Sequence, residues 1–235
     1  GLLGMNWTGA VERCLAAGVV AGGHGVGGLM GENWTGAVTK CYAVALVSGE
    51  RDVGGLMGEN GGFISSCYAM GTVMGEDHEA GGLVGWNYGG IGESYAACAV
   101  TGGSDLGGLV GWNDGAVDNS YWDTQISGLA TSAGGSGKTT AQMKQPATFT
   151  GWNFATIWGI VENETYPYLM DFGPDMVPVP SLTPMERAVG QADGTTTFSV
   201  ANIGGGTLVY SASESETWLS IASGGSGTNS GTIVV

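Results

Sequence analysis

The stretch SAGGSGKTT, residues 132–140, is the part of the sequence that most resembles a chemical motif. A phosphate-binding loop has the pattern G-x-x-x-x-G-K-[ST] between a buried strand and a helix, so that backbone N–H groups surround the phosphates. Gly137 and Lys138 match the end of this pattern, but its first glycine would fall at Ser132. The preceding SYWDTQISGLAT lacks the apolar run of a buried strand, and Pro146 stops any following helix after about two turns. We therefore predict a turn here and no nucleotide site.

Other catalytic arrangements have few candidate residues. The two histidines, His24 and His78, lie outside any H-E-x-x-H pattern, and EDHEA at residues 76–80 is expected to be a solvated corner. Arg13 and Lys40 fall in one column of the repeat described below, but that column continues with residues that are not basic. Polysaccharide lyases use β-helices, and this likeness of fold alone leaves a polysaccharide-processing enzyme as the weaker alternative. We predict that the chain is not an enzyme.

Aromatic residues offer a better case for binding. Trp86 and Trp112 recur one repeat apart, with Tyr88 close to the first of them, and Trp7 and Trp34 form a second pair. Flat side chains at regular spacing on a rigid face can hold sugar rings or a protein surface. The alternative is that these rings pack against one another and shield the core. We expect Trp218, further along the chain, to be a core residue of a second domain.

The composition narrows the class of protein. Glycine accounts for 47 of the 235 residues, about three times its ordinary share of roughly 7%, whereas lysine and arginine together number six and the net charge is −15. Nucleic acid is excluded as a partner because phosphate binding needs clustered basic residues. Glycine and charge interrupt every apolar run, so no membrane insertion is expected. No motif for a cofactor is present, and calcium is chemically possible at acidic corners without a motif that supports it. The chain begins at Gly1 inside a repeated motif, and we expect it to be a piece of a longer protein.

The positions of these residues follow from an internal repeat. The motif GL[LMV]G-x-N recurs five times with steps of 27, 27, 27 and 26 residues, and each unit holds three short apolar patches separated by glycine and asparagine. A repeat of this length with three strands per unit predicts a parallel β-helix of about five coils, in an all-β protein. The five units begin at Gly1, Gly28, Gly55, Gly82 and Gly108.

Equivalent residues of successive coils should stack into ladders about 4.8 Å apart. We expect an inward leucine ladder, an inward column of valines, an asparagine ladder at a corner, and an outward column that varies in size and charge. A bend is expected near Lys40. The leucines are Leu2, Leu29, Leu56, Leu83 and Leu109; the β-branched column is Val20, Val47, Val73, Val100 and Ile126; the asparagines are Asn6, Asn33, Asn60, Asn87 and Asn113; the outward column is Met5, Glu32, Glu59, Trp86 and Trp112.

The cysteines follow the same repeat. Cys14, Cys41 and Cys67 share a column that Ser94 and Ser120 continue. Side chains that point the same way on adjacent coils have poor geometry for a disulfide, and the spacing does not match a zinc site. We predict free, buried thiols, including the fourth cysteine in a different column.

GGLVGWNYGGIGESYAACAVTGG, residues 81–103, resembles the GLUG repeat of large bacterial surface and secreted proteins. Residues 120–169 resemble the segment that often closes such arrays, in which TTAQMKQ is expected to be a short helix with Thr139 or Thr140 as its N-cap. The predicted domain at residues 1–170 is thus a GLUG β-helix, with repeats over about 1–120 and a cap over 121–170. The cap would cover the open strand edge of the last coil.

The composition changes after the cap. Residues 171–184 contain four of the six prolines and are predicted to form a linker. Residues 185–235 alternate apolar and polar residues, as in TFSV and TLVYSAS, which is typical of antiparallel strands. This region resembles part of a BACON domain, an immunoglobulin-like β-sandwich of secreted bacterial proteins.

These resemblances imply an extracellular, secreted or cell-surface module of a large bacterial protein. Its expected role is adhesion or carbohydrate binding without catalysis, with glycans or a host or extracellular-matrix protein as the partner. The alternative is a passive spacer that presents a catalytic domain elsewhere in the protein.

Overall fold

The structure, a computed structural model, describes residues 1–173, 180–183, 194–202, 209–212 and 220–235. The chain divides into two compact units, Gly1–Pro174 and Asp175–Val235. Trp218, which we expected in the core of the second domain, lies outside the described residues.

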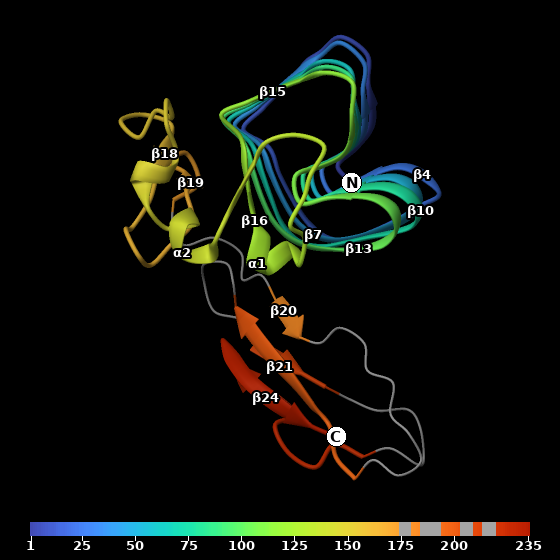
Figure 1. The fold of residues 1–235 in the computed structure, drawn as a ribbon, viewed down its shortest axis with the longest axis vertical. Coiled ribbons are helices and arrows are strands. Elements are labelled where there is room, and N and C mark those ends of the chain that lie inside the picture. The colour runs from blue at the N-terminus through green and yellow to red at the C-terminus, as the bar shows by residue number, and fades with distance from the viewer. Residues whose placement is uncertain (174–179, 184–193, 203–208, 213–219) are drawn as a thin grey trace. The chain divides into compact units, whose positions relative to one another are not determined.

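The first unit contains a parallel β-solenoid, which confirms the predicted fold (Figure 1). Each coil contributes a strand to three sheets, and strands of successive coils pair in parallel. The first sheet consists of β1 (Leu3–Asn6), β5 (Met30–Asn33), β8 (Met57–Asn60), β11 (Val84–Asn87) and β14 (Val110–Asn113). The second consists of β2 (Ala10–Glu12), β6 (Ala37–Thr39), β9 (Phe63–Ser65), β12 (Gly90–Gly92) and β15 (Ala116–Asp118). The third consists of β3 (Leu15–Ala21), β4 (His24–Gly27), β7 (Tyr42–Gly54), β10 (Tyr68–Gly81), β13 (Tyr95–Gly107), β16 (Tyr121–Asp123) and β17 (Ser136–Lys138).

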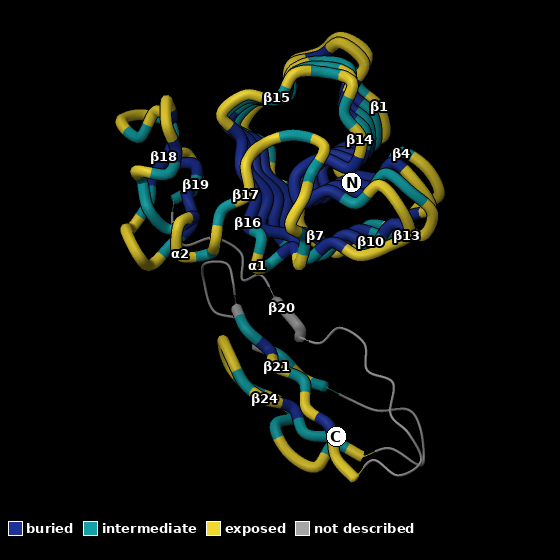
Figure 2. Tube along the Cα trace, in the orientation of Figure 1, coloured by how far each residue is buried: buried dark blue, intermediate teal, exposed yellow. Residues whose placement is uncertain are grey.

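The core is made by the stacked apolar columns (Figure 2). Leu29, Leu56, Leu83 and Leu109 are completely buried, whereas Leu2 in the first coil is 56% exposed. The column that starts at Val20 stays in the sheet as far as Val100. Ile126 leaves that column, contrary to the prediction, because Asp123 accepts hydrogen bonds from the N–H groups of Gln125 and Ile126 and begins helix α1 (Thr124–Ser127).

The asparagines form a hydrogen-bonded ladder at the end of the first sheet. Each side-chain Nδ2 donates to the Oδ1 of the asparagine in the next coil, over distances of 2.7–3.0 Å. The Nδ2 groups also donate to backbone oxygens of the adjoining turn, such as Gly36 O at 2.9 Å from Asn33. The asparagine amides thereby supply hydrogen-bond partners for buried polar groups of the turn. The central members Asn33, Asn60 and Asn87 are fully buried.

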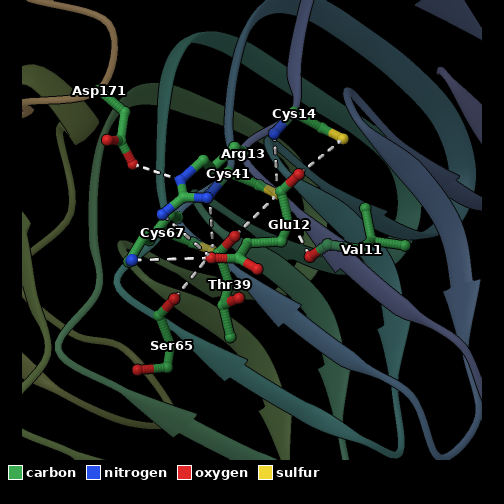
Figure 3. Close-up of polar contacts among 10 residues, drawn as sticks. Val11, Glu12, Arg13, Cys14, Thr39, Cys41, Ser65, Cys67 and Asp171 are labelled. Carbon is green, nitrogen blue, oxygen red and sulfur yellow. Dashed lines mark hydrogen bonds and ion pairs between the residues drawn. The ribbon is translucent and has the colours of Figure 1, made fainter.

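A second corner joins the second and third sheets at the bend expected near Lys40. The stacked residues there have φ between 44° and 53°, in the left-handed region; they are Arg13, Lys40, Ser66, Glu93 and Asn119. The thiols follow directly after this bend (Figure 3). Cys14 N–H donates to Cys41 Sγ at 3.3 Å, and Cys41 N–H to Cys67 Sγ at 3.4 Å. All four cysteines are free, as predicted, and three are buried while Cys14 is partly exposed at the open coil.

The stretch that resembles a phosphate loop closes the solenoid. Its residues 136–138 form strand β17, which pairs in parallel with β16, so part of the predicted turn is a short strand. Ser132 Oγ accepts hydrogen bonds from the N–H groups of Leu109 and Val110 at 3.1 and 2.9 Å. Backbone and side-chain groups of this segment thus occupy the edge of the last coil. Helix α2 (Thr140–Met143) follows, with Thr139 as its N-cap in a capping box with Gln142.

The rest of the first unit packs on the outer face of the third sheet. Tyr42, Tyr68 and Tyr95 stack with ring centroids 4.7 and 5.0 Å apart, and Trp158 lies 6.1 Å from the second and third rings. Tyr95 Oη donates to Pro167 O at 2.7 Å. This aromatic cluster fixes the segment on the solenoid, because such rings bury large apolar areas. The segment contains η1 (Pro146–Thr148) and the antiparallel pair β18 (Trp158–Gly159) and β19 (Tyr168–Leu169).

The second unit has two small antiparallel sheets among its described residues. One joins β20 (Pro180–Thr183), β21 (Thr197–Asn202) and β24 (Ser230–Val234); the other joins β22 (Val209–Ser211) and β23 (Ser226–Thr228). Val200 and Ile233 form its buried apolar centre. Strand β20 lies within the residues predicted to be a linker.

Candidate functional site

The first sheet presents an outer ladder of side chains that we define as Met5, Glu32, Glu59, Trp86 and Trp112. These residues pair in register from strand to strand across the sheet. Because successive side chains of a strand point to opposite faces, the buried residues beside them place this ladder outside. The ladder changes from carboxylates in the second and third coils to indoles in the fourth and fifth.

Two indoles of the outer ladder share one hydrogen-bond acceptor. The Nε1 atoms of Trp86 and Trp112 each lie 3.1 Å from Asp114 Oδ2. Tyr88 contacts Trp86 edge to face, with centroids 5.3 Å apart. Trp112 is 46% exposed and Tyr88 is also exposed, whereas Trp86 is half-buried. We call Trp86, Tyr88 and Trp112 the aromatic patch; its two indoles come from adjacent coils and are held at their N–H edges by one carboxylate.

The second predicted tryptophan pair lies at the open end of the solenoid. The rings of Trp7 and Trp34 stack, with centroids 4.8 Å apart and an interplanar angle of 20°. Trp34 Nε1 donates to Glu32 Oε2 at 3.1 Å. Both rings are exposed, Trp7 at 61%. This pair therefore combines mutual packing with an accessible surface.

Four carboxyl groups gather beside the outer ladder, and we call Glu32, Glu59, Asp52 and Glu79 the carboxyl cluster. Asp52 and Glu79 occupy equivalent places on the neighbouring strands β7 and β10, and their side chains hydrogen-bond to each other. Both have left-handed backbones, with φ of 53° and 62°. We expected residues 76–80 to form a solvated corner. Instead residues 76–80 continue strand β10, and the last of them, Ala80, is completely buried.

Asp52 holds a proton at neutral pH that a free carboxyl group would lose. Asp52 is 6% exposed, and burial, the hydrogen bond with Glu79, and the charges of Glu79 and Glu59 raise its pKa to about 8 against the weaker opposing effect of Arg51. Burial and the charges of Glu32 and Glu79 also raise the pKa of Glu59. Asp52 is therefore mostly protonated at neutral pH.

The aromatic patch and the carboxyl cluster adjoin one another. Glu59 and Trp86 are register partners on neighbouring strands. The ring of Tyr88 lies over Gly61 in the coil of Glu59, where a β-carbon would come within 2.2 Å of its Cε2 atom. Burial and the charges of Glu59 and Glu32 raise the pKa of the Tyr88 hydroxyl. Aromatic rings and acidic groups thus lie on one face, an arrangement able to hold a ligand with apolar and cationic parts.

The basic residues considered in the sequence lie elsewhere. Lys40 Nζ and Arg13 each lie 3.6 Å from Glu12 Oε1, and Arg13 Nε also donates to Asp171 Oδ2 at 2.7 Å (Figure 3). These ion pairs are at the second corner, away from the first sheet. His24 and His78 lie 3.3 Å from Glu50 and 3.0 Å from Glu79.

Sequence reasoning missed Asp52 and Glu79. A signal was available, because the two residues are 27 positions apart, the length of the repeat. Within the described residues, no group of three or more His, Cys, Asp or Glu side chains has the arrangement of a metal site. None of the described helices is long and apolar enough to cross a membrane.

The solenoid is similar to a solved structure from Bacteroides ovatus that is named "a putative immunoglobulin A1 protease". The TM-score is 0.54 at 24% sequence identity, and the match covers 68% of this chain and 57% of the other. At this identity the likeness shows the fold. No family model matches the chain, and no curated protein does.

This neighbour corrects one prediction made from the sequence. We predicted a protein that is not an enzyme, because few residues had the spacing of a catalytic site. The same fold occurs in a chain named as a protease, so the fold and the composition do not mark the protein as non-catalytic. The chain spans little more than half of that neighbour's length.

Proposed function

We propose that the solenoid is an extracellular glycan-binding module of a secreted or cell-surface bacterial protein, as the resemblance to GLUG repeats implies. The observation that carries the proposal is the shared contact of Trp86 and Trp112 with Asp114 Oδ2. It holds two indoles on adjacent coils by their N–H edges, so that sugar rings can stack on the exposed surface of the patch.

The scaffold supports this function because it is rigid. The strands under the patch are fixed by backbone ladders and by the asparagine ladder, so little conformational entropy is lost when a ligand binds. Adhesion of the parent protein would then follow from several such contacts along a repeated surface. The resemblance of residues 185–235 to a BACON domain agrees with a secreted, carbohydrate-related protein.

A glycan array with the full chain tests the proposal. We expect saturable binding to a defined set of sugars and at least a tenfold weaker affinity in the double variant Trp86→Ala, Trp112→Ala. The matched control is Phe63→Ala, which removes a ring that is 50% exposed on β9, in the second sheet. Equal loss in the control would indicate a general effect on folding.

A folded protein that binds none of the sugars would refute the proposal and favour the passive spacer. Binding that survives the double variant but is lost in Trp7→Ala, Trp34→Ala would place the site at the stacked pair instead. Binding of a host or extracellular-matrix protein in place of any glycan would also refute it.

A further inference from the structure

We propose that the carboxyl cluster is a subsite for a cationic group of the bound glycan, namely the free amino group of a hexosamine that is not acetylated. The inference rests on the proposed glycan-binding function and names the class of sugar that the face would select.

Two carboxylates converge on one point of the surface. A β-carbon at Gly25 would lie 3.3 Å from Glu32 Oε1 and 3.7 Å from Glu59 Oε1, so both side chains reach the same corner from adjacent coils. Glu32 accepts a hydrogen bond from Trp34, but no hydrogen bond or ion pair joins Glu59 to any residue in the described part of the chain. An ammonium group can donate three hydrogen bonds, and its positive charge would be attracted by the two carboxylates at this corner.

The buried member of the cluster also lacks a partner. Asp52 Oδ1 is inaccessible to solvent and accepts no hydrogen bond within the described residues, although Asp52 itself contacts Glu79. Buried carboxyl oxygens normally have a donor, and a buried charge is retained when a counter-ion is near. A cation bound at Glu59 would favour the charged form of Asp52 and so allow this side chain to release its proton.

Among the described residues, no cation forms an ion pair with Glu32 or Glu59. Arg51 lowers the pKa of Asp52 and His24 lowers that of Glu59, each as the smallest of the effects on that group. Arg51 is exposed, His24 lies against Glu50, and His78 lies against Glu79. The acidic groups that face the corner are Glu32, Glu59, Asp52 and Glu79, and the net charge of −15 strengthens attraction of a cation.

The neighbouring patch explains why the cation would belong to a sugar. A ring stacked on Trp86 would place a substituent near Glu59, its register partner one strand spacing away, about 4.8 Å. An ammonium there would also lie beside Tyr88, whose ring can contribute a cation–π contact. A sugar that carries the amine would use the indoles for stacking and the carboxylates for its charge at the same time.

The test compares two ligands that differ only in acetylation: β-1,4-linked glucosamine oligomers and N-acetylglucosamine oligomers of the same length. Calorimetry with the full chain at about pH 5.5 keeps the amine charged. We expect at least tenfold tighter binding of the amine form, and a loss of most of this preference in Glu59→Gln, with the affinity for the acetylated form unchanged within twofold. Asp105→Asn, which removes an exposed carboxylate on the next coil, is the control for net charge.

Equal binding of the two oligomers, with dependence on Trp86 and Trp112, would overturn the inference and leave the proposed function intact. Binding of neither oligomer, with another glycan bound on the array through the patch, would also overturn it. If no glycan binds at all, the proposed function itself fails. If Asp105→Asn reduces the preference for the amine form as much as Glu59→Gln does, the preference reflects general attraction by the acidic surface and the inference is overturned. If oligolysine binds at the same corner more strongly than the glucosamine oligomer, the subsite belongs to peptides and the inference is likewise overturned.

Discussion

Replacing Asp52 with asparagine tests the proton held in the carboxyl cluster. The amide has the size of a protonated carboxyl group, can donate to Glu79, and tolerates the left-handed backbone at this position, where φ is 53°. The variant therefore keeps the hydrogen bond but cannot titrate. Any difference in pH dependence between it and the wild type then belongs to Asp52.

The sign follows from the raised pKa. In the unfolded chain Asp52 has a pKa near 4, and in the folded protein about 8, so between these values the folded state binds more protons. The contribution of Asp52 to the free energy of unfolding must therefore fall as pH rises from about 4 to about 8. The steepest possible slope is about 1.4 kcal/mol per pH unit, or about 4 kcal/mol between pH 5 and pH 8. This is the upper limit for one titrating group, and we expect about half of it.

Thermal unfolding of the full chain, followed by circular dichroism at pH 5 and pH 8, measures the effect. Relative to the wild type, Asp52→Asn should gain about 2 kcal/mol, or roughly 4–8 °C in Tm, on going from pH 5 to pH 8. Asp105→Asn, which removes an exposed carboxyl group two coils further along, is the control for the loss of one acidic side chain. A difference between Asp52→Asn and the wild type that stays constant from pH 5 to pH 8 would refute the raised pKa of Asp52.

Two further substitutions test the ladders. Asn60→Ala should lower the free energy of unfolding by about 2–4 kcal/mol, because it leaves the buried donor of Asn33 and the buried acceptor of Asn87 without partners. Asn6→Ala, in the first coil, should lower it by less. Equal losses for the two variants in urea unfolding would contradict the ladder. Cys67→Ser should change the free energy of unfolding by less than about 1 kcal/mol, because Ser94 fills the same column in the next coil and donates to the equivalent carbonyl. A larger loss of this free energy in urea unfolding would show that the thiols are needed for packing.

The resemblance to a phosphate loop shows how a local pattern can mislead. Residues 132–140 contain the end of that motif, but their neighbours in sequence could not form its strand and helix. The prediction of a turn was only partly right, since Ser136–Lys138 pair with β16. The pairing depends on the free edge of the last coil, which is a feature of the stacked array rather than of the segment itself.

The repeat by itself determined the solenoid, the register and the ladders. A spacing of 27 residues fixes which residues become neighbours on adjacent strands, so the stacking of Leu56 on Leu83, of Asn60 on Asn87, and the outward position of Trp86 followed from counting. Tertiary structure alone decided how the sheets meet at their edges. Asp52 and Glu79 act on Glu59 from the long strands of the third sheet, and Asp114 contacts both indoles from the turn after β14. The repeat length governs contacts along the solenoid axis, whereas contacts between sheets depend on backbone bends and burial that no spacing encodes.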